Sequence, residues 1–195
     1  GSASRGGSDS GALTRSGGIT NGGFLATFGG SGDIAVTTTA TTGTGGLTKD
    51  GAGALTLSAA NTYTGTTTLS AGTLNLNHAT AAGNGTFTIG GASTLDNTSG
   101  GSITLSNNNI ENWNANFTFT GSNALNLGTG AVTLGADRTL TISASTLTVA
   151  GAIGDGASTF AITKAGAGTL LLSGNNTYDG VTTVSAGVLN IQHAN

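Results

Sequence analysis

The chain has 195 residues, of which 7% are charged, 36% are hydrophobic and 36 are glycine, and its formal net charge is −3. This is not the composition of a disordered chain, and five basic residues are too few to line a surface that binds nucleic acid. No apolar run reaches the roughly 20 residues of a membrane-spanning helix, so we expect no membrane insertion of this segment, and the absence of cysteine excludes disulfides and thiolate chemistry.

Residues 1–18 show no basic segment followed by a continuous apolar run, which is the pattern of a secretory signal peptide. They are rich in glycine and serine instead, a composition typical of flexible linkers. We therefore interpret residues 1–18 as a flexible lead-in, or as residues left from cloning, and expect the folded part to comprise residues 19–195.

Residues 46–79 and 161–194 are copies of one another. Aligned without a gap, 33 successive positions of the two segments correspond, and 21 of them are identical. The two lysines of the chain, Lys49 and Lys164, stand at the head of the two copies, 115 residues apart. Self-similarity at a fixed period is typical of repeat proteins, so we expect the folded part to be a segment of a longer repeat protein.

Apolar and polar residues alternate in short runs along the chain, such as ALTLS, TLNLN, GTFTIG and RTLTIS. Alternation with a period of two indicates β-strands with one buried face. No segment has the spacing of an amphipathic helix. The chain is therefore predicted to be all-β, with many short strands.

Many short strands fit either a sandwich or barrel of antiparallel hairpins, or a solenoid whose strands stack on their own successors. Corresponding leucines recur every 19 to 23 residues, which favours the solenoid because it is the length of one coil of a repeat protein. We predict a right-handed parallel β-helix with about three short strands per turn. The leucines expected to pair are Leu55 with Leu74, Leu125 with Leu147, Leu147 with Leu170, and Leu170 with Leu189.

In such a coil the apolar residues face one interior, each stacked about 4.8 Å from its equivalent in the next turn. Threonine suits the outward positions without any binding role. Corner glycines such as Gly51 and Gly166 are expected to adopt positive φ angles. The predicted inward residues are Leu55, Leu57, Leu74, Leu76, Phe87, Ile89, Leu95, Ile103, Leu105, Phe117, Phe119, Leu125, Leu127, Val132, Leu134, Leu140, Ile142, Leu147, Val149, Leu170, Leu172, Leu189 and Ile191.

The repeated segment contains a lysine, Gly-x-Gly-x-Leu-x-Leu, Asn-Thr-Tyr with a glycine two residues later, Thr-Thr, and Ala-Gly-x-Leu. This pattern closely resembles the autotransporter-associated β-strand repeat, also called the passenger-associated transport repeat. The second copy departs from it at Asp179, where the family usually has threonine. The motif residues that we expect to be structural are Lys49, Gly51, Gly53, Asn61, Tyr63, Gly65, Gly72, Lys164, Gly166, Gly168, Asn176, Tyr178, Gly180 and Gly187.

The resemblance implies an extracellular segment of a bacterial autotransporter passenger, which a C-terminal translocator carries through the Gram-negative outer membrane. It further implies that the motif aids export. The family pattern brings no catalytic residues and no cofactor, and we expect none here.

The aromatic and amide residues of the motif have two interpretations. Tyr63 and Tyr178 either cover a corner between two strands, with the hydroxyl paired locally, or stack on sugars. Asn61 and Asn176 either close turns and stack as an internal ladder, or recognise a ligand. We favour the structural interpretation for all four.

The histidines and carboxylates do not indicate a metal site or an enzyme. His78 and His193 are one period apart, roughly 25 Å at 4.8 Å per turn, so they cannot share an ion, and we expect solvated histidines in turns. Cleavage of a polysaccharide needs two nearby carboxylates, whereas the acidic residues here occur singly. We therefore expect a protein that is not an enzyme.

The segment NNNIENWNANFTFTG holds the single tryptophan, Trp113, and the single glutamate, Glu111. One interpretation is a bulged loop that packs Trp113 onto the interior. The other is an exposed Trp113 that contacts a glycan. Trp113 is therefore a candidate ligand contact.

The sequence thus predicts a non-catalytic stalk segment of a secreted or surface-exposed bacterial passenger. The alternative is an adhesin or binding module for glycan or ice, which would use threonine-rich faces, if the threonines align in register, or the loop of Trp113. The expected partners are a glycan or host surface, and further copies of the chain that associate end to end through open strand edges.

Overall fold

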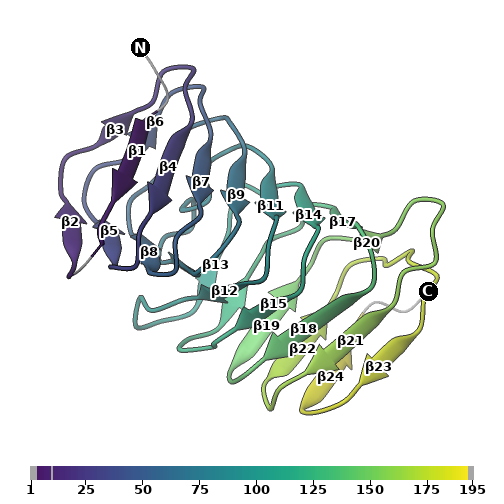
Figure 1. The fold of residues 1–195 in the computed structure, drawn as a ribbon. Helices are drawn as coiled ribbons and strands as arrows, with labels where there is room; N and C mark the ends of the chain where they lie inside the picture. The colour runs from purple at the N-terminus through teal and green to yellow at the C-terminus, as the bar shows by residue number, and fades with distance from the viewer. Residues whose placement is uncertain (1–3, 10, 193–195) are drawn as a thin grey trace.

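The computed structural model describes residues 4–9 and 11–192, which form one elongated coil with the two ends far apart (Figure 1). Within these residues the secondary structure consists of short strands, and there is no helix. Every strand pairing is parallel, and each strand pairs with strands about one turn earlier and later in the chain. The predicted fold class, an all-β parallel solenoid, is confirmed.

The strands form three faces. Face A contains β1 (Ser4–Gly7), β4 (Ala26–Gly29), β7 (Leu47–Lys49), β9 (Thr67–Leu69), β11 (Phe87–Ile89), β14 (Glu111–Trp113), β17 (Val132–Leu134) and β20 (Ile153–Gly154). Face B contains β2 (Leu13–Arg15), β5 (Ile34–Val36), β8 (Ala54–Leu57), β10 (Thr73–Leu76), β12 (Ser93–Asp96), β15 (Phe117–Phe119), β18 (Arg138–Ile142), β21 (Ile162–Ala165) and β23 (Thr182–Val184).

Face C is the third side of the coil and is interrupted. It begins with the pair β3 (Ile19–Thr20) and β6 (Thr41–Thr42). It resumes with β13 (Ile103–Thr104), β16 (Leu125–Asn126), β19 (Thr146–Val149), β22 (Thr169–Leu172) and β24 (Val188–Ile191). Between them, the first copy of the repeated motif places loops on this side of the coil.

The register of the strands confirms the spacing read from the leucines. Leu74 pairs with Leu55 on face B, and Leu147 pairs with both Leu125 and Leu170 on face C. Leu189 pairs with Leu170 in the last described turn. Because side chains alternate along a strand, this register stacks like on like in the interior.

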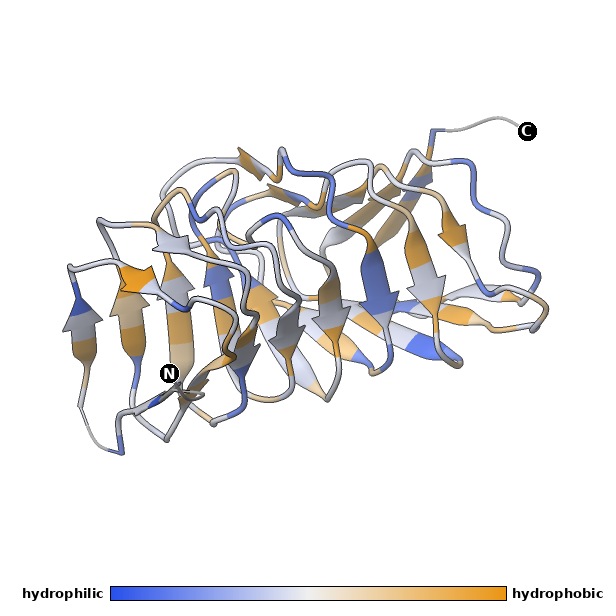
Figure 2. Ribbon diagram, turned by 90° about the horizontal axis from the view of Figure 1, so that it is seen from above, coloured by the Kyte–Doolittle hydropathy of each residue, from blue (hydrophilic) through white to orange (hydrophobic). Residues whose placement is uncertain are grey.

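The buried apolar residues form one continuous cluster along the interior of the coil. In Figure 2, hydrophobic segments, coloured orange, recur on the strands along the length of the coil. Nearly all of the predicted inward residues are buried, among them Leu55, Phe119 and Leu172, each with 0% of its surface exposed. Ile191 is the clear exception, since 58% of its surface is exposed. It belongs to the last described turn, which no further described strand covers.

The expectation of a flexible lead-in over residues 1–18 is wrong for much of that segment. Strand β1 pairs with β4 on face A, and β2 pairs with β5 on face B. The solenoid therefore extends before residue 19. Residues 1–3, 10 and 193–195 lie outside the described residues, and with them the predicted turn position of His193.

The two copies of the motif occupy different faces. The first copy forms β7, β8, β9 and β10 on faces A and B, whereas the second forms β21, β22, β23 and β24 on faces B and C. Five turns above β7 on face A lies β20, and the second copy starts on the following strand, β21. The period of 115 residues is therefore five turns plus one face of the coil.

Candidate functional site

Lys49 lies at an inward position of β7, in register with Phe28 below it and Leu69 above it. Only 2% of its surface is exposed. Its Nζ donates hydrogen bonds to the carbonyl oxygen of Gly51, in the same corner, and to that of Ala71, one turn later, at 3.3 Å. The ammonium group therefore joins the corners of two successive turns. Burial lowers the pKa of Lys49, and the nearby Asp50 opposes that shift.

Lys164 repeats this arrangement in the second copy. It is fully buried, and its Nζ donates to the carbonyl oxygens of Ala165 at 3.0 Å, Gly166 at 2.8 Å and Ala186 at 3.1 Å. Burial lowers the pKa of Lys164 as well. A buried lysine is rare unless its charge is compensated; here backbone carbonyl dipoles provide the compensation. We call each such arrangement a lysine clamp.

Two glycines of the motif make room for the lysine clamp. Gly72 has a φ of 69°, and a Cβ placed there would lie 2.6 Å from the Nζ of Lys49 and 2.6 Å from the carbonyl oxygen of Gly53. Gly187 has the same φ, and a Cβ there would lie 2.8 Å from the Nζ of Lys164. The glycine of the Ala-Gly pair is therefore required for two reasons: the backbone there has a positive φ, and a side chain would overlap the lysine clamp.

The other motif glycines are needed mainly for close contact between turns, which corrects part of the expectation from sequence. Gly166 does have a positive φ of 79°, but Gly51 is not among the described residues with a positive φ. A Cβ at any of the remaining motif glycines would overlap the backbone of the turn before it: Gly51 with Gly30, Gly53 with Gly32, Gly65 with Gly45, Gly168 with Ala144, and Gly180 with Phe160.

Asn61 is buried and joins three successive turns. Its Oδ1 accepts a hydrogen bond from the backbone N–H of Thr41 at 2.8 Å, and its Nδ2 donates to the carbonyl oxygen of Ala81 at 2.8 Å. Asn176 makes the first of these contacts in the second copy, where its Oδ1 accepts from the N–H of Ile153 at 3.0 Å. The geometry is that of an internal bridge between turns.

Tyr63 is fully buried beneath the turn that follows it. Its hydroxyl lies 2.6 Å from the Oγ1 of Thr67, which donates at 2.7 Å to the carbonyl oxygen of Ala82. Burial raises the pKa of Tyr63. Tyr178 has the same 2.6 Å contact with Thr182 but is only partly buried.

Sequence reasoning missed Thr67 as a member of this network. It faces inward with 0% of its surface exposed, at a strand position where the pattern would place an apolar residue. The identity of Thr67 with Thr182 in the second copy is the signal that could have identified it, because an inward threonine needs a hydrogen-bond partner.

The structure contradicts the interpretation of Trp113 as a ligand contact. Trp113 is fully buried, lies edge-on to Phe117 and donates from Nε1 to the Oε2 of Glu111 at 2.8 Å. Glu111 is itself 1% exposed, and burial raises its pKa to about 8. The interpretation that Trp113 packs onto the interior is therefore confirmed. Its loop is not, because Glu111–Trp113 form strand β14 with the side chains of Glu111 and Trp113 turned inward.

The remaining candidates form no second site. His78 is half-buried, and its Nδ1 lies 3.1 Å from the Oγ1 of Thr80, in a local turn. Among the described residues no group of three or more potential metal-ligating side chains occurs. The described part of the chain also has no helix with the length and apolar character that crossing a membrane requires.

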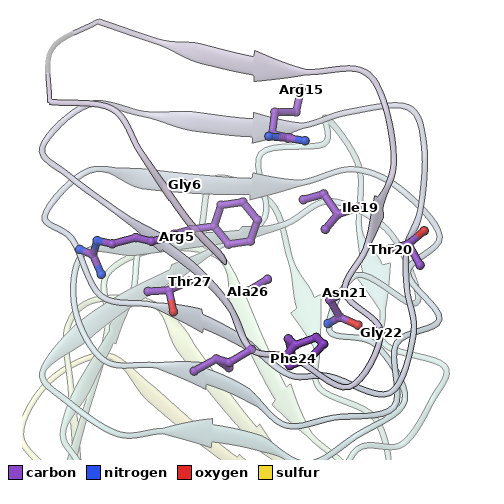
Figure 3. A pocket seen from close by; sticks show the side chains of 12 residues that line it. Arg5, Gly6, Arg15, Ile19, Thr20, Asn21, Gly22, Phe24, Ala26 and Thr27 are labelled. Atoms are coloured by element: carbon purple, nitrogen blue, oxygen red, sulfur yellow. The ribbon is translucent and has the colours of Figure 1, made fainter. Parts of the chain in front are cut away.

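A cavity of about 420 Å³ opens in the first turns of the coil (Figure 3). Arg5 and Arg15 lie at its edges, and Ile19, Phe24 and Phe28 contribute apolar surface. The cavity lies where β1 presents Gly6 opposite Phe28. It is thus a gap at the first end of the interior column, one strand away from Lys49, because Phe28, which lines it, pairs with Lys49.

These features define a class of protein: a parallel β-solenoid whose turns are joined by a repeated structural clamp. The family description that matches is the passenger-associated-transport-repeat, at residues 47–76 and 162–191, which are the two clamp segments. The chain belongs to the family of proteins that carry this repeat.

A curated relative supports this membership. The chain is 36% identical over 179 residues to the protein named adhesin BmaC autotransporter of Brucella suis biovar 1 (strain 1330). The similar region covers 88% of this chain and 5% of that protein, so the chain spans only a small part of its relative's length. No solved structure matches the chain.

Proposed function

We propose that this chain is a non-catalytic stalk segment in the surface-exposed or secreted passenger of an autotransporter, at the outer surface of a Gram-negative bacterium. The observation that carries the proposal is the uninterrupted interior column with polar outward positions on its strands. In a solenoid of this kind each turn is stabilised by contacts with its neighbouring turns, so the coil can be extended in length without a separate globular core. The similarity to an autotransporter named as an adhesin supports the placement in a passenger.

The motif serves export in this proposal by ordering the coil locally. Each lysine clamp joins two turns through residues about 20 positions apart, and Asn61 joins three. Loops of this length close at a low entropic cost. The clamp therefore helps a short stretch of newly exported chain to hold its coil before the remainder has folded.

Export of an autotransporter passenger that contains this chain tests the proposal. The double variant Lys49→Met and Lys164→Met should reduce the amount of passenger at the cell surface relative to the total amount made. The matched control is Thr48→Ala with Thr163→Ala, at the outward positions beside the two lysines. Equal surface display of the two double variants would contradict a role of the motif in export.

A second candidate function is binding of a glycan by face A. The register aligns one outward side chain per turn along this face, namely Thr27, Thr48, Thr68, Thr88, Asn112 and Thr133. The row places threonines in register on one face, as this candidate function requires, but it is one residue wide and contains Asn112 in place of threonine in one turn. Glycan-array binding by the chain, lost in the variant Thr48→Lys with Thr88→Lys, would favour an adhesin over a stalk, and a thermal-hysteresis assay tests ice in the same way.

A further inference from the structure

Asp155 is a buried carboxylate with one unsatisfied oxygen. It directly follows β20, and only 5% of its surface is exposed. Its Oδ2 accepts hydrogen bonds from the backbone N–H groups of Phe160 at 2.9 Å and Asp179 at 3.2 Å. Its Oδ1 is buried as well, but no hydrogen-bond donor among the described residues reaches it. One oxygen of the carboxylate is therefore held by the backbone, and the other has no partner within the described chain.

Asp96 shows how the coil satisfies a carboxylate that is buried to the same extent. It is also 5% exposed, and its Oδ1 accepts hydrogen bonds from the N–H groups of Asn97 at 2.8 Å and Ser122 at 2.9 Å. Its Oδ2 accepts a third from the Oγ of Ser122 at 2.6 Å. The missing partner at Asp155 is thus not a general consequence of burying a carboxylate in this coil.

No positive side chain of the described residues compensates the charge of Asp155. The ion pair that they contain joins Arg5 to Asp50, in the first turns of the coil. Burial lowers the pKa of Lys164, and no nearby carboxylate opposes that shift. Two other buried oxygens lack a partner, but Thr41 is uncharged and Asp50 is paired with Arg5. Because a buried charge is normally paired or bound to a metal ion, a cation beside the Oδ1 of Asp155 would complete its environment.

Asp155 begins a loop that is longer in the second copy of the motif than in the first. Thr41 and Ile153 are equivalent, because each donates its N–H to the internal asparagine of its copy. From there to the first inward residue of the motif, which is Leu47 or Ile162, the chain runs six residues in the first copy and nine in the second. The three additional residues extend the loop between β20 and β21 (Figure 1).

The carboxylate of Asp155 replaces a backbone carbonyl group. Its counterpart in the first copy is Gly43, whose carbonyl oxygen accepts a hydrogen bond from the N–H of Thr64 at 3.0 Å. In the second copy the corresponding N–H, that of Asp179, donates to the Oδ2 of Asp155 instead. Asp179 itself stands where the first copy has Thr64. The second copy therefore brings two carboxylates to a place where the first copy has none.

We propose that Asp155 and Asp179 bind a Ca²⁺ ion at the loop between β20 and β21. The Oδ1 of Asp155 and the exposed carboxylate of Asp179 are the charged ligands. The hydroxyl of Ser158 and the backbone carbonyl groups of the loop are available as uncharged oxygen ligands. Ca²⁺ accepts about six to eight oxygen atoms, water included, in flexible geometry, whereas Mg²⁺ requires a near-ideal octahedron. With two carboxylates, the site should be weak, with a dissociation constant of about 10⁻⁴–10⁻³ M.

The site is complete within the described turns. Asp155 lies in the turn beneath the second copy, and that copy already covers it, since the N–H of Asp179 donates to its carboxylate. Thr64, the counterpart of Asp179, remains exposed although a further turn follows the first copy. Asp179 is therefore at a position that stays open to solvent and to ions. The site goes beyond the proposed role as a stalk and does not depend on it.

Calcium titration of the full chain by isothermal calorimetry tests the proposal. We expect one Ca²⁺ ion per chain, and binding of Mg²⁺ that is weaker by about tenfold or more. Asp155→Asn keeps an oxygen for the two N–H donors but removes the charge, and Asp179→Thr restores the residue of the first copy. Each should weaken Ca²⁺ binding by about tenfold or more. The matched control Asp96→Asn changes a carboxylate that is equally buried but fully hydrogen-bonded, and it should leave the affinity unchanged.

The proposal is wrong if the parent chain binds no Ca²⁺ at millimolar concentrations, because water or a proton then satisfies the buried oxygen. It is also wrong if either Asp155→Asn or Asp179→Thr binds Ca²⁺ as tightly as the parent, or if Asp96→Asn loses binding to the same extent. Circular dichroism without Ca²⁺ shows whether each variant is folded. Because Asp179 is exposed, Asp179→Thr tests the site even if Asp155→Asn does not fold.

Discussion

Lys49 and Lys164 form equivalent clamps on different faces of the same coil. Lys49 extends inward from β7 on face A, and Lys164 extends inward from β21 on face B. Each ammonium group bonds to carbonyl oxygens of its own corner and of the corner one turn later. The clamp therefore depends on the local path of two turns and not on the side of the coil where it lies.

Replacing Lys49 by methionine keeps most of the aliphatic side chain but removes the ammonium group. The partly buried carbonyl oxygens of Gly51 and Ala71 then lose a charged donor, which we expect to cost about 1–3 kcal/mol of unfolding free energy. Urea denaturation measures the loss, with Thr48→Ala as the outward control in the same strand. A methionine variant as stable as the parent would show that the clamp contributes nothing.

Tyr63 and Tyr178 provide a comparison within one chain. Tyr63→Phe removes a hydroxyl that contacts Thr67 in the buried interior, and we expect a loss of about 1 kcal/mol. Tyr178→Phe removes the same contact in a partly exposed site, where water can replace the hydroxyl, so the loss should be smaller. Thermal unfolding of both variants checks the order, and the reverse order would contradict the assignment of burial.

A comparison of alanine substitutions at Gly72 and Gly100 distinguishes the stability cost of steric overlap from that of backbone strain. Both have a positive φ, 69° and 90° respectively, but a Cβ at Gly100 meets nothing within 4 Å, whereas one at Gly72 meets the clamp of Lys49. We expect Gly100→Ala to cost about 1 kcal/mol, from backbone strain alone, and Gly72→Ala to cost about 2 kcal/mol more. Urea denaturation midpoints of the two variants test this, and equal losses would remove the case for a crowded clamp.

Glu111 should make the stability of the coil depend on pH. Its pKa is raised from 4.5 to about 8 by burial, so between these values the folded chain holds a proton that the unfolded chain has released. Unfolding free energy is therefore highest below about pH 4.5 and falls, by a few kcal/mol in total, as the pH rises towards and through 8.

Unfolding of the parent and of Glu111→Gln at pH 5 and pH 8.5, followed by the fluorescence of Trp113, measures this effect. Glutamine retains an oxygen that accepts from the indole N–H, so the variant should lose the pH dependence but keep the fold. An exposed carboxylate, Asp179, provides the control variant Asp179→Asn. A parent whose stability does not change between the two pH values would contradict a buried, protonated Glu111.

The hypotheses of glycan and ice binding depend on the row of outward threonines on face A, which the sequence pattern did not reveal. Counted along the chain, the Thr-x-Thr pairs are irregular, because turns differ in length. The strand register on face A nevertheless places Thr48 beside Thr68, and Thr68 beside Thr88, in one row. Loops of different length between strands conceal this alignment from any analysis of linear spacing.

The sequence by itself determined the fold class and the pairing of turns. Period-two alternation identified the strands, and the recurrence of leucine predicted four pairs that the register contains. Such features are readable because a solenoid turn contacts only its neighbours, so most of its contacts lie one short period away.

Only the tertiary structure decided what the polar residues of the interior do. Lys49, Thr67, Glu111 and Trp113 lie on strands of three residues, and whether they point inward depends on the path of the corners on either side. The carbonyl groups that hold Lys49 come from two turns and form an acceptor site only when those turns stack. A linear pattern shows the spacing of residues, but the direction of a side chain and the partners around it arise only when separate turns are brought into contact.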